Sequence, residues 1–231
     1  MSGRREELAS GLAAVRERVD AGLAAAGRTD PPTLVAVTKF FPASDVDLLA
    51  ELGVTDVGEN RDQEASVKCA ELAHRDRLTI HFIGQLQSNK AGSVARYADV
   101  VQSVDRPKIV SALERAAARE GRRLDVLVQV GLDRSGDRGG ADPADVAALA
   151  DAVASAEHLR LRGLMAVAPL GEEPRAAFAR LRRLSERLCR DHPGATWVSA
   201  GMSADLEDAL AEGATHLRVG SAILGSRPSH R

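Results

Sequence analysis

The stretch LVAVTK, residues 34–39, is a short apolar run that is rich in valine and ends on a lysine. Seven further runs of this kind follow it along the chain. They occupy residues 56–60, 78–84, 100–104, 124–130, 159–167, 196–201 and 216–222. Most are continuously apolar, which is typical of parallel strands covered on both faces, although Arg160 and Arg162 make the run at 159–167 alternate. The pattern predicts eight parallel strands.

Helical patterns separate these runs. The first helix is predicted from apolar residues at spacings of three and four, which are Leu8, Leu12, Val15, Val19 and Leu23. Ser44 is a candidate cap for a helix beginning at Asp45, Pro107 and Pro143 suit the first turns of later helices, and Ser203 precedes the last helix. Strands that alternate with helices at this length indicate an α/β fold, a single (β/α)8 TIM barrel. An open doubly wound sheet is the alternative. We expect one domain over residues 1–231, with the extra N-terminal helix, in residues 1–30, packed outside the barrel.

The composition excludes several classes of protein. Lys and Arg number 31 against 33 Asp and Glu, which argues against a partner such as nucleic acid or a membrane surface. No apolar run approaches the roughly 20 residues that span a bilayer, and the N-terminal residues lack the apolar core of a signal peptide. These features predict a cytoplasmic protein. Cys69 and Cys189 lie far apart, so a structural zinc site is excluded and both are predicted to be apolar packing residues.

The polar and glycine residues gather at the ends of the predicted strands, where barrels of this kind carry their chemistry. Lys39 ends the first run, Gly201 and Ser203 follow the seventh, and Gly220 and Ser221 end the eighth. The loops after strands seven and eight commonly bind phosphate, and glycines let backbone N–H groups approach an anion. Each motif alone could be an ordinary turn with a capping serine. Together, at these two positions, they predict a phosphate site.

Lys39 has two interpretations. A lysine at a strand end is usually solvated. At the mouth of a barrel, however, a desolvated lysine becomes a nucleophile for carbonyl groups. An aldehyde with a phosphate group would occupy both the lysine and the glycine-serine rim, and pyridoxal 5′-phosphate is such a molecule. We therefore predict that this cofactor is held on Lys39.

Other residues of the runs are less distinctive. His81 is interpreted as a satisfied core or rim histidine, and Trp197 and Phe178 as core residues. Asn60 either hydrogen-bonds a ring substituent or ends its strand. Arg218 lies within a predicted strand, and a buried arginine needs a hydrogen-bond partner, for which a ring nitrogen and a carboxylate are the candidates.

Seven stretches carry a resemblance to a known family: LVAVTK, DVGENRDQEA, HFIGQLQSNK, VQSVDRPKI, LRLRGLMAV, SAGMSADLEDAL and THLRVGSAILG. They lie in this order between residues 34 and 225. Through them the chain resembles the YggS/PROSC group, the pyridoxal phosphate homeostasis proteins. The resemblance implies a fold type III barrel, like the N-terminal domain of alanine racemase, with the cofactor as an internal aldimine on Lys39.

The resemblance also implies contacts to the phosphate from Ser203, Gly220 and Ser221, and an Arg218 that faces the pyridine nitrogen. The complete set of cofactor-binding residues that we predict is Lys39, Asn60, Ser199, Gly201, Met202, Ser203, Arg218, Gly220 and Ser221. We predict that the chain has no catalytic residues and no metal site. Phe41 stands where many members of the family carry a second lysine. Arg138 is the nearest counterpart of their lysine in the loop after the fifth strand, and an arginine forms no Schiff base. Whether that loop or Lys90 forms a secondary site stays open.

Three classes of function fit these residues. The resemblance favours a protein that stores or delivers pyridoxal phosphate without classical enzyme activity, with apoenzymes as candidate recipients. The alternative is an amino-acid racemase or decarboxylase. Racemases of this fold need a second, β-rich domain that supplies a tyrosine, whereas the one tyrosine here is Tyr97, predicted on a helix. The third is a barrel enzyme for a phosphorylated metabolite. We expect no nucleic-acid or membrane partner, and a monomer, with a dimer as the alternative.

Overall fold

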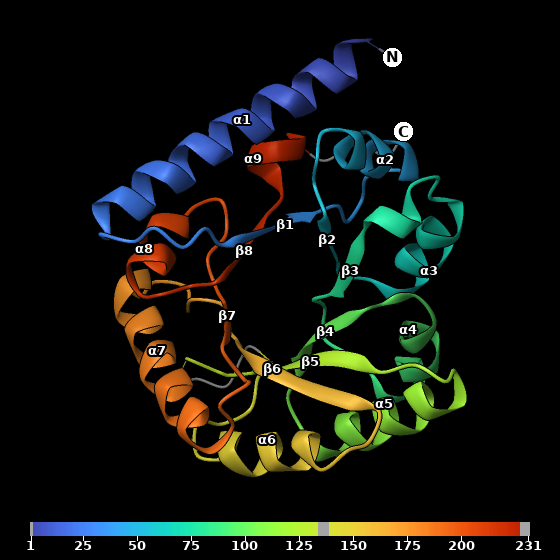
Figure 1. Ribbon diagram of the computed structural model, residues 1–231, viewed down its shortest axis with the longest axis vertical. Coiled ribbons are helices and arrows are strands. Elements are labelled where there is room, and N and C mark those ends of the chain that lie inside the picture. Colours follow the sequence, from blue (N-terminus) through green and yellow to red (C-terminus); the bar gives the residue numbers. More distant parts are fainter. Residues whose placement is uncertain (1, 134–138, 227–231) are drawn as a thin grey trace.

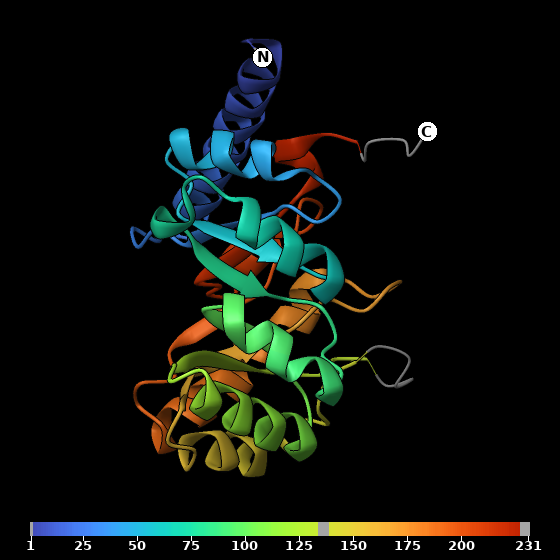
Figure 2. The same ribbon diagram turned by 90° about the vertical axis from the view of Figure 1, so that its right-hand side faces the viewer.

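The computed structural model describes residues 2–133 and 139–226. In this part of the chain, eight parallel strands pair in chain order and close into a barrel, which confirms the predicted TIM barrel (Figure 1). The strands are β1 (Thr33–Val37), β2 (Asp56–Glu59), β3 (Thr79–Phe82), β4 (Val100–Val104), β5 (Leu124–Gln129), β6 (Leu159–Met165), β7 (Trp197–Ser199) and β8 (His216–Val219). Their arrows point toward one side of the molecule (Figure 2), so the carboxyl ends of the strands share one face.

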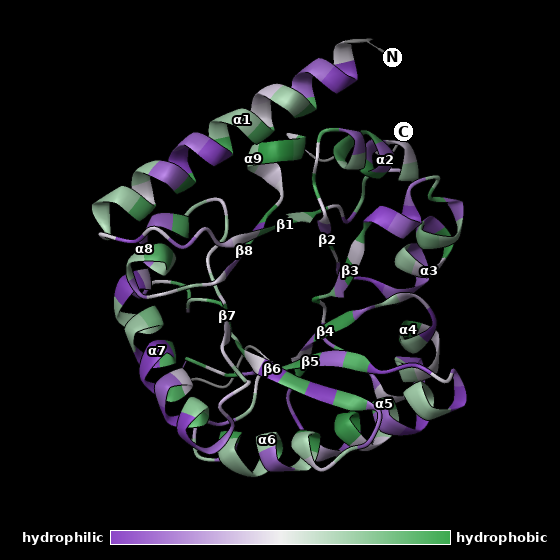
Figure 3. Cartoon of the chain, viewed as in Figure 1, coloured by the Kyte–Doolittle hydropathy of each residue, from purple (hydrophilic) through white to green (hydrophobic). Residues whose placement is uncertain are grey.

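Helices surround this barrel (Figure 1). They are α1 (Ser2–Ala25), α2 (Ala43–Glu51), α3 (Asp62–Glu71), α4 (Ala91–Tyr97), α5 (Pro107–Arg119), α6 (Val146–Ala154), α7 (Pro174–Asp191), α8 (Leu206–Ala211) and α9 (Ser221–Leu224), with 3₁₀ turns η1 (Arg75–Arg77) and η2 (Ser88–Lys90). Apolar side chains between strands and helices form the main core. The alternation predicted for residues 159–167 is real, because β6 changes between hydrophobic and hydrophilic residues along its length (Figure 3).

Several predicted boundaries are wrong. The first strand ends at Val37, so Lys39 lies in the following loop rather than at the end of the strand. Helix α2 begins at Ala43, directly after Pro42, so Ser44 lies inside the helix and does not cap it. Helix α6 begins at Val146, because a turn follows Pro143. After β1, the Phe40 N–H donates to the Glu64 carboxylate rather than to a neighbouring strand, which explains the early end of that strand.

The N-terminal helix α1 packs along α8 and α9 on the outside of the barrel (Figure 1). Gly11 permits this contact, because a Cβ there would lie 2.5 Å from the carbonyl oxygen of Ile223. The guanidinium of Arg4 donates to the Leu224 carbonyl (3.1 Å), and that of Arg18 donates to the Ser203 carbonyl (3.0 Å). Helix α1 therefore braces the loops that follow β7 and β8.

In the described ranges, none of the helices combines the length and apolar character needed to cross a membrane. The same ranges hold no cluster of His, Cys, Asp and Glu that is suited to a metal ion. Cys69 is buried, and this burial raises the pKa of its thiol to about 12. Cys189 is half-buried, and its Sγ lies 3.3 Å from the carbonyl oxygen of Ala195.

Candidate cofactor site

A cavity of about 330 Å³ lies at the carboxyl ends of β1 and β8. It brings together six of the nine predicted site residues, which are Lys39, Met202, Ser203, Arg218, Gly220 and Ser221. Apolar side chains of the loop after β1, Phe40 and Phe41, also line it. Its lining therefore combines an amine, two hydroxyls and a guanidinium with apolar surface.

The loop that carries Lys39 has a constrained backbone. The Thr38 N–H still donates to the Gly58 carbonyl (3.0 Å), which continues the pairing of β1 with β2 for one residue. Phe40 then adopts a φ of 71°, in the left-handed region that is unusual for a bulky residue. Such a conformation costs about 1–3 kcal/mol and persists only where its surroundings hold it. The Phe40 N–H donates to Glu64 Oε1 at 2.5 Å, which is one such contact.

A buried network of charges supports this loop from α3 and β2. The Lys68 ammonium, 6% exposed, donates to the Thr38 carbonyl (2.8 Å), to Glu59 Oε1 (2.8 Å) and to Glu64 Oε1 (2.9 Å). Glu59, 1% exposed, also accepts the Thr38 hydroxyl at 2.6 Å. Burial raises the pKa of Glu59, against the opposing effect of the Lys68 charge. Lys68 thus hydrogen-bonds the backbone of the Lys39 loop at Thr38. It also pairs with Glu59, which would otherwise be a buried charge without a counter-charge.

The sequence alone does not predict this network. The i, i+4 spacing of Glu64 and Lys68 is a usable signal, since these positions are neighbours on a helix. The partner Glu59 lies on a strand, and its contact with Lys68 depends on how α3 packs against the barrel.

Two hydroxyls meet at the other end of the cavity. Ser221 is the first residue of α9, and its Oγ lies 3.3 Å from Ser203 Oγ. Gly220 precedes the helix and lies close to β1, because a Cβ at this position would be 3.2 Å from the Val37 carbonyl oxygen. Ser203 was predicted to lie at a helix start, but α8 begins only at Leu206. Of the two serines, only Ser221 lies at a helix start, that of α9.

Arg218 is buried, at 4% exposed, beside this cavity. Its Nη1 donates to Ser199 Oγ (2.6 Å) and its Nη2 to the Ala166 carbonyl (2.8 Å). Neither partner is the carboxylate suggested from the sequence, and the ring nitrogen as a further partner stays a prediction. Burial lowers the pKa of Arg218 to about 10, with Asp205 acting in the opposite direction. Ser199 is fully buried, and its Oγ accepts a hydrogen bond from Arg218, which lines the cavity.

Gly201 is not among the described residues that line the cavity, although the next residue, Met202, lines it. The φ of Gly201 is +89°, and a Cβ would lie 2.6 Å from Ala209 Cβ and 2.9 Å from Leu217 Cδ2. Its carbonyl accepts the Arg218 N–H at 2.9 Å. The structure therefore gives Gly201 a conformational and packing role beside the site.

Asn60 lines a different cavity, of about 550 Å³, together with Gln129 and Val167. Lys90 pairs with Asp62 at 3.6 Å, at the end of η2. Arg138 lies outside the described residues.

The predicted core assignments are confirmed for His81, which is fully buried and hydrogen-bonded through both ring nitrogens, and for the buried Phe178. Trp197 is half-buried and packs its ring against that of His216, with centroids 4.3 Å apart.

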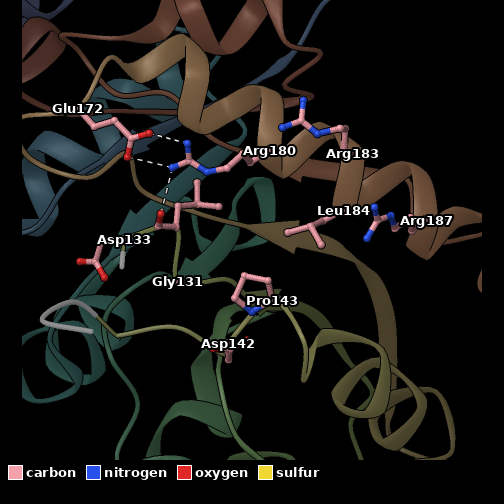
Figure 4. A pocket seen from close by; sticks show the side chains of 10 residues that line it. Gly131, Asp133, Asp142, Pro143, Glu172, Arg180, Arg183, Leu184 and Arg187 are labelled. Carbon is pink, nitrogen blue, oxygen red and sulfur yellow. Dashed lines mark hydrogen bonds and ion pairs between the residues drawn. The ribbon is translucent and has the colours of Figure 1, made fainter. Parts of the chain in front are cut away.

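A larger cavity, of about 890 Å³, lies between α7 and the segments around residues 131–133 and 142–143 (Figure 4). Arg180 closes one end, where its guanidinium donates to Glu172 and to the Leu132 carbonyl (3.0 Å). Arg183 and Arg187 extend from the same helix and are exposed. None of the predicted site residues lines this cavity.

Comparison with known proteins places these features in a family. A family model described as the N-terminal domain of alanine racemase matches residues 12–228. A relative in Mycobacterium tuberculosis (strain ATCC 25618 / H37Rv), named pyridoxal phosphate homeostasis protein, is 45% identical, over 97% of this chain and 94% of the relative. The protein of that name in Escherichia coli (strain K12) is 36% identical, over 96% of this chain and 97% of the relative.

Solved structures of other proteins share this fold. PipY of Synechococcus elongatus PCC7942, determined with PLP bound, has a TM-score of 0.83 and 35% identity, over 94% of this chain and all of that one (100%). Alanine racemase from Streptomyces coelicolor A3(2) has a TM-score of 0.78 at 20% identity, over 97% of this chain and 59% of that one. At that identity the racemase shows a shared fold alone.

Proposed function

The chain belongs to the family of pyridoxal phosphate homeostasis proteins, and on this premise we propose that it binds pyridoxal 5′-phosphate and acts in the homeostasis of that cofactor. Its role is to store and deliver the cofactor, without classical enzyme turnover. The observation that carries the proposal is the single cavity in which Lys39 meets the Ser203 and Ser221 hydroxyls and the Arg218 guanidinium. PipY, a relative of known structure, was determined with PLP bound.

The residues present fit the chemistry of this cofactor. Its aldehyde needs an amine, and Lys39 is the one of the chain's four lysines that lines the cavity. Its phosphate needs hydrogen-bond donors, which Ser203, Ser221 and the backbone at Gly220 provide. When bound, the cofactor supplies an aldehyde that forms a covalent bond with a lysine amine and a ring that withdraws electrons.

The chain's own groups would then divide the work. The two serines orient the phosphate, and the apolar side chains of Phe40 and Phe41 exclude water from one side of the cavity. Arg218 carries only donors, so it leaves a ring nitrogen that faces it without a proton. Arg218 would thereby favour holding the cofactor over reaction on it.

Absence of turnover is the finer part of the proposal. Racemization needs an acid/base group on each face of the substrate. Lys39 can serve one face, and the other described residues that line the cavity include no His, Tyr, Asp or Glu. Tyr97 is buried on α4, and this burial raises the pKa of its hydroxyl.

The test is to incubate the cofactor-loaded protein with L-alanine and other L-amino acids and to follow the D-enantiomers by chiral chromatography. We expect rates at the background of the free cofactor. A turnover on the order of 1 s⁻¹ that disappears in Lys39→Ala would establish the racemase instead.

We further propose a single domain over residues 1–231, a monomer and a cytoplasmic location, with pyridoxal phosphate-dependent apoenzymes as recipients of the cofactor. The near balance of 31 basic and 33 acidic residues supports the absence of a nucleic-acid partner. Delivery is tested by mixing the loaded protein with an apoenzyme and following recovery of that enzyme's activity. Recovery no faster than with an equal concentration of free cofactor would contradict delivery.

A further inference from the structure

A line of buried polar side chains crosses the interior of the barrel from the cofactor cavity to the opposite mouth. We call this hydrogen-bonded line of Arg218, Ser199, Gln102, His81 and Asp56 the relay. Arg218 Nη1 donates to Ser199 Oγ (2.6 Å), which donates to Gln102 Oε1 (2.7 Å). Gln102 Nε2 lies 2.8 Å from His81 Nδ1, and His81 Nε2 lies 2.8 Å from Asp56 Oδ1. Gln102, His81 and Ser199 are each 0% exposed. The five side chains come from five strands, so only the closed barrel brings them together.

Asp56, at the far end of the line, determines in which direction the hydrogen bonds run from donor to acceptor. Burial raises the pKa of Asp56, but hydrogen bonds from His81 and from Thr55 outweigh it and hold that pKa below its usual value. Asp56 is therefore an ionised, acceptor-only group, and His81 Nε2 must carry a proton to meet it. In the neutral ring Nδ1 is then an acceptor, which requires the amide nitrogen of Gln102 to face it. The amide oxygen is left for the Ser199 hydroxyl, so every bond runs from Arg218 toward Asp56.

Other titratable and charged groups lie near His81 in the barrel interior. Its neighbour on β8, His216, has its ring centroid 6.3 Å away, and burial lowers the pKa of His216 to about 4. Arg218 and Arg162 already place two cations near this interior, and Arg162 lies over the Trp197 ring at 4.2 Å. A proton on Nδ1 would face the Gln102 N–H and would force the amide to turn over. The turned amide would offer Ser199 a donor in place of its acceptor.

We propose that His81, Gln102 and Ser199 are positioning residues that fix the Arg218 guanidinium against the cofactor ring, with the neutral Nε2–H form of His81 setting the direction of the hydrogen bonds. The part that concerns the cofactor rests on the proposed function. It follows that the amino-terminal mouth of this barrel, a face that usually serves stability, influences how the cofactor is held.

The first test needs no cofactor. We expect ¹⁵N NMR of the cofactor-free protein to show His81 with a proton on Nε2 and none on Nδ1, with the resonance assigned from its loss in His81→Asn. In Gln102→Glu the carboxylate offers acceptors to both neighbours, so His81 should become doubly protonated. The proposed direction of the hydrogen bonds would be refuted if wild-type His81 carried its proton on Nδ1, or if His81 stayed neutral in Gln102→Glu. Either result would count whatever the protein binds.

The second test measures the affinity for pyridoxal phosphate and its visible absorption in the loaded protein. Ser199→Ala and Gln102→Leu should each weaken affinity about three- to tenfold, as expected for a loosened charged hydrogen bond, and should shift the absorption maximum.

Ser103→Ala is the matched control. Ser103 lies next to Gln102 on β4, is 1% exposed, and its Oγ has no hydrogen-bond partner among the described residues. Ser103 therefore makes no hydrogen bond to a member of the relay, and its variant should bind like the wild type. Equal effects of Ser199→Ala and Ser103→Ala would refute the positioning role. A wild-type protein that binds no cofactor would contradict the proposed function, and the NMR result would still decide the relay.

Discussion

Lys68→Met removes the cation of the buried network behind the Lys39 loop while keeping a side chain of similar length. Glu59 then retains the Thr38 hydroxyl as a partner but loses its counter-charge in a site where it is 1% exposed. Breaking one side of a buried ion pair costs about 3–5 kcal/mol. Glu59 can limit this cost by taking up a proton, which for a carboxyl of ordinary pKa 4.5 costs about 3.4 kcal/mol at pH 7, at about 1.36 kcal/mol per pH unit. We therefore expect a loss of about 3 kcal/mol at neutral pH.

The same reasoning gives the pH dependence. A protonated Glu59 no longer needs Lys68, so the loss of stability should shrink to about 1 kcal/mol at pH 5, where protonation costs little. The assay is urea denaturation of wild type and variant at both pH values. Lys108→Met is the control, because Lys108 is an exposed lysine on α5, and surface changes of this kind usually stay within about 0.5 kcal/mol.

The double variant Lys68→Met/Glu59→Gln separates charge from packing, since it removes both members of the pair. It should be more stable than Lys68→Met alone at pH 7. A Lys68→Met variant as stable as Lys108→Met, or one whose deficit is equal at pH 5 and pH 7, would refute the reasoning.

Three further predictions follow from individual contacts. Ser203→Ala or Ser221→Ala should weaken binding of pyridoxal phosphate roughly 10- to 150-fold, the loss of a hydrogen bond to a charged group, and should not change the much weaker binding of pyridoxal measured by fluorescence titration. Gly201→Ala should destabilise the protein by about 3 kcal/mol or more, because it adds a 2.6 Å clash to an unfavourable φ, whereas Gly27→Ala, with open space around it, should cost about 1–2 kcal/mol in urea denaturation. Burial lowers the pKa of His216 from 6.5 to about 4, so the unfolded chain takes up its proton first and stability should fall by about 3 kcal/mol as the pH drops from 6.5 to 4. His216→Phe should flatten that part of the stability profile, and an unchanged profile would contradict the assignment.

The barrel and much of its rim could be predicted because both are local features of the sequence. A valine-rich run such as residues 34–39 indicates a covered parallel strand without reference to its neighbours. Gly220 and Ser221 end the last such run, and the barrel topology alone places them beside Lys39. The ends of the strands were less predictable, since hydrogen bonds such as that from the Phe40 N–H to Glu64 determine where a strand ends.

The interior of the barrel could not be predicted from single stretches. Gln102 and Ser103 are adjacent polar residues in the same run, and only the register of β4 in the closed barrel decides that Gln102 joins His81 and Ser199. The pairing of Lys68 with Glu59 likewise depends on the packing of α3 on β2. Arg218 was predicted to need a partner, but the choice between a ring nitrogen, a carboxylate and a serine is a matter of three-dimensional position.

The most direct test of the account is to identify the lysine that holds the cofactor. The purified protein is loaded with pyridoxal phosphate, its absorbance is recorded before and after borohydride, and the reduced protein is digested and analysed by mass spectrometry. We predict a visible band that borohydride removes, a cofactor adduct on the peptide that contains Lys39, and loss of both in Lys39→Ala. A reducible band that persists in Lys39→Ala, with the adduct on Lys68, Lys90 or Lys108, would contradict the account.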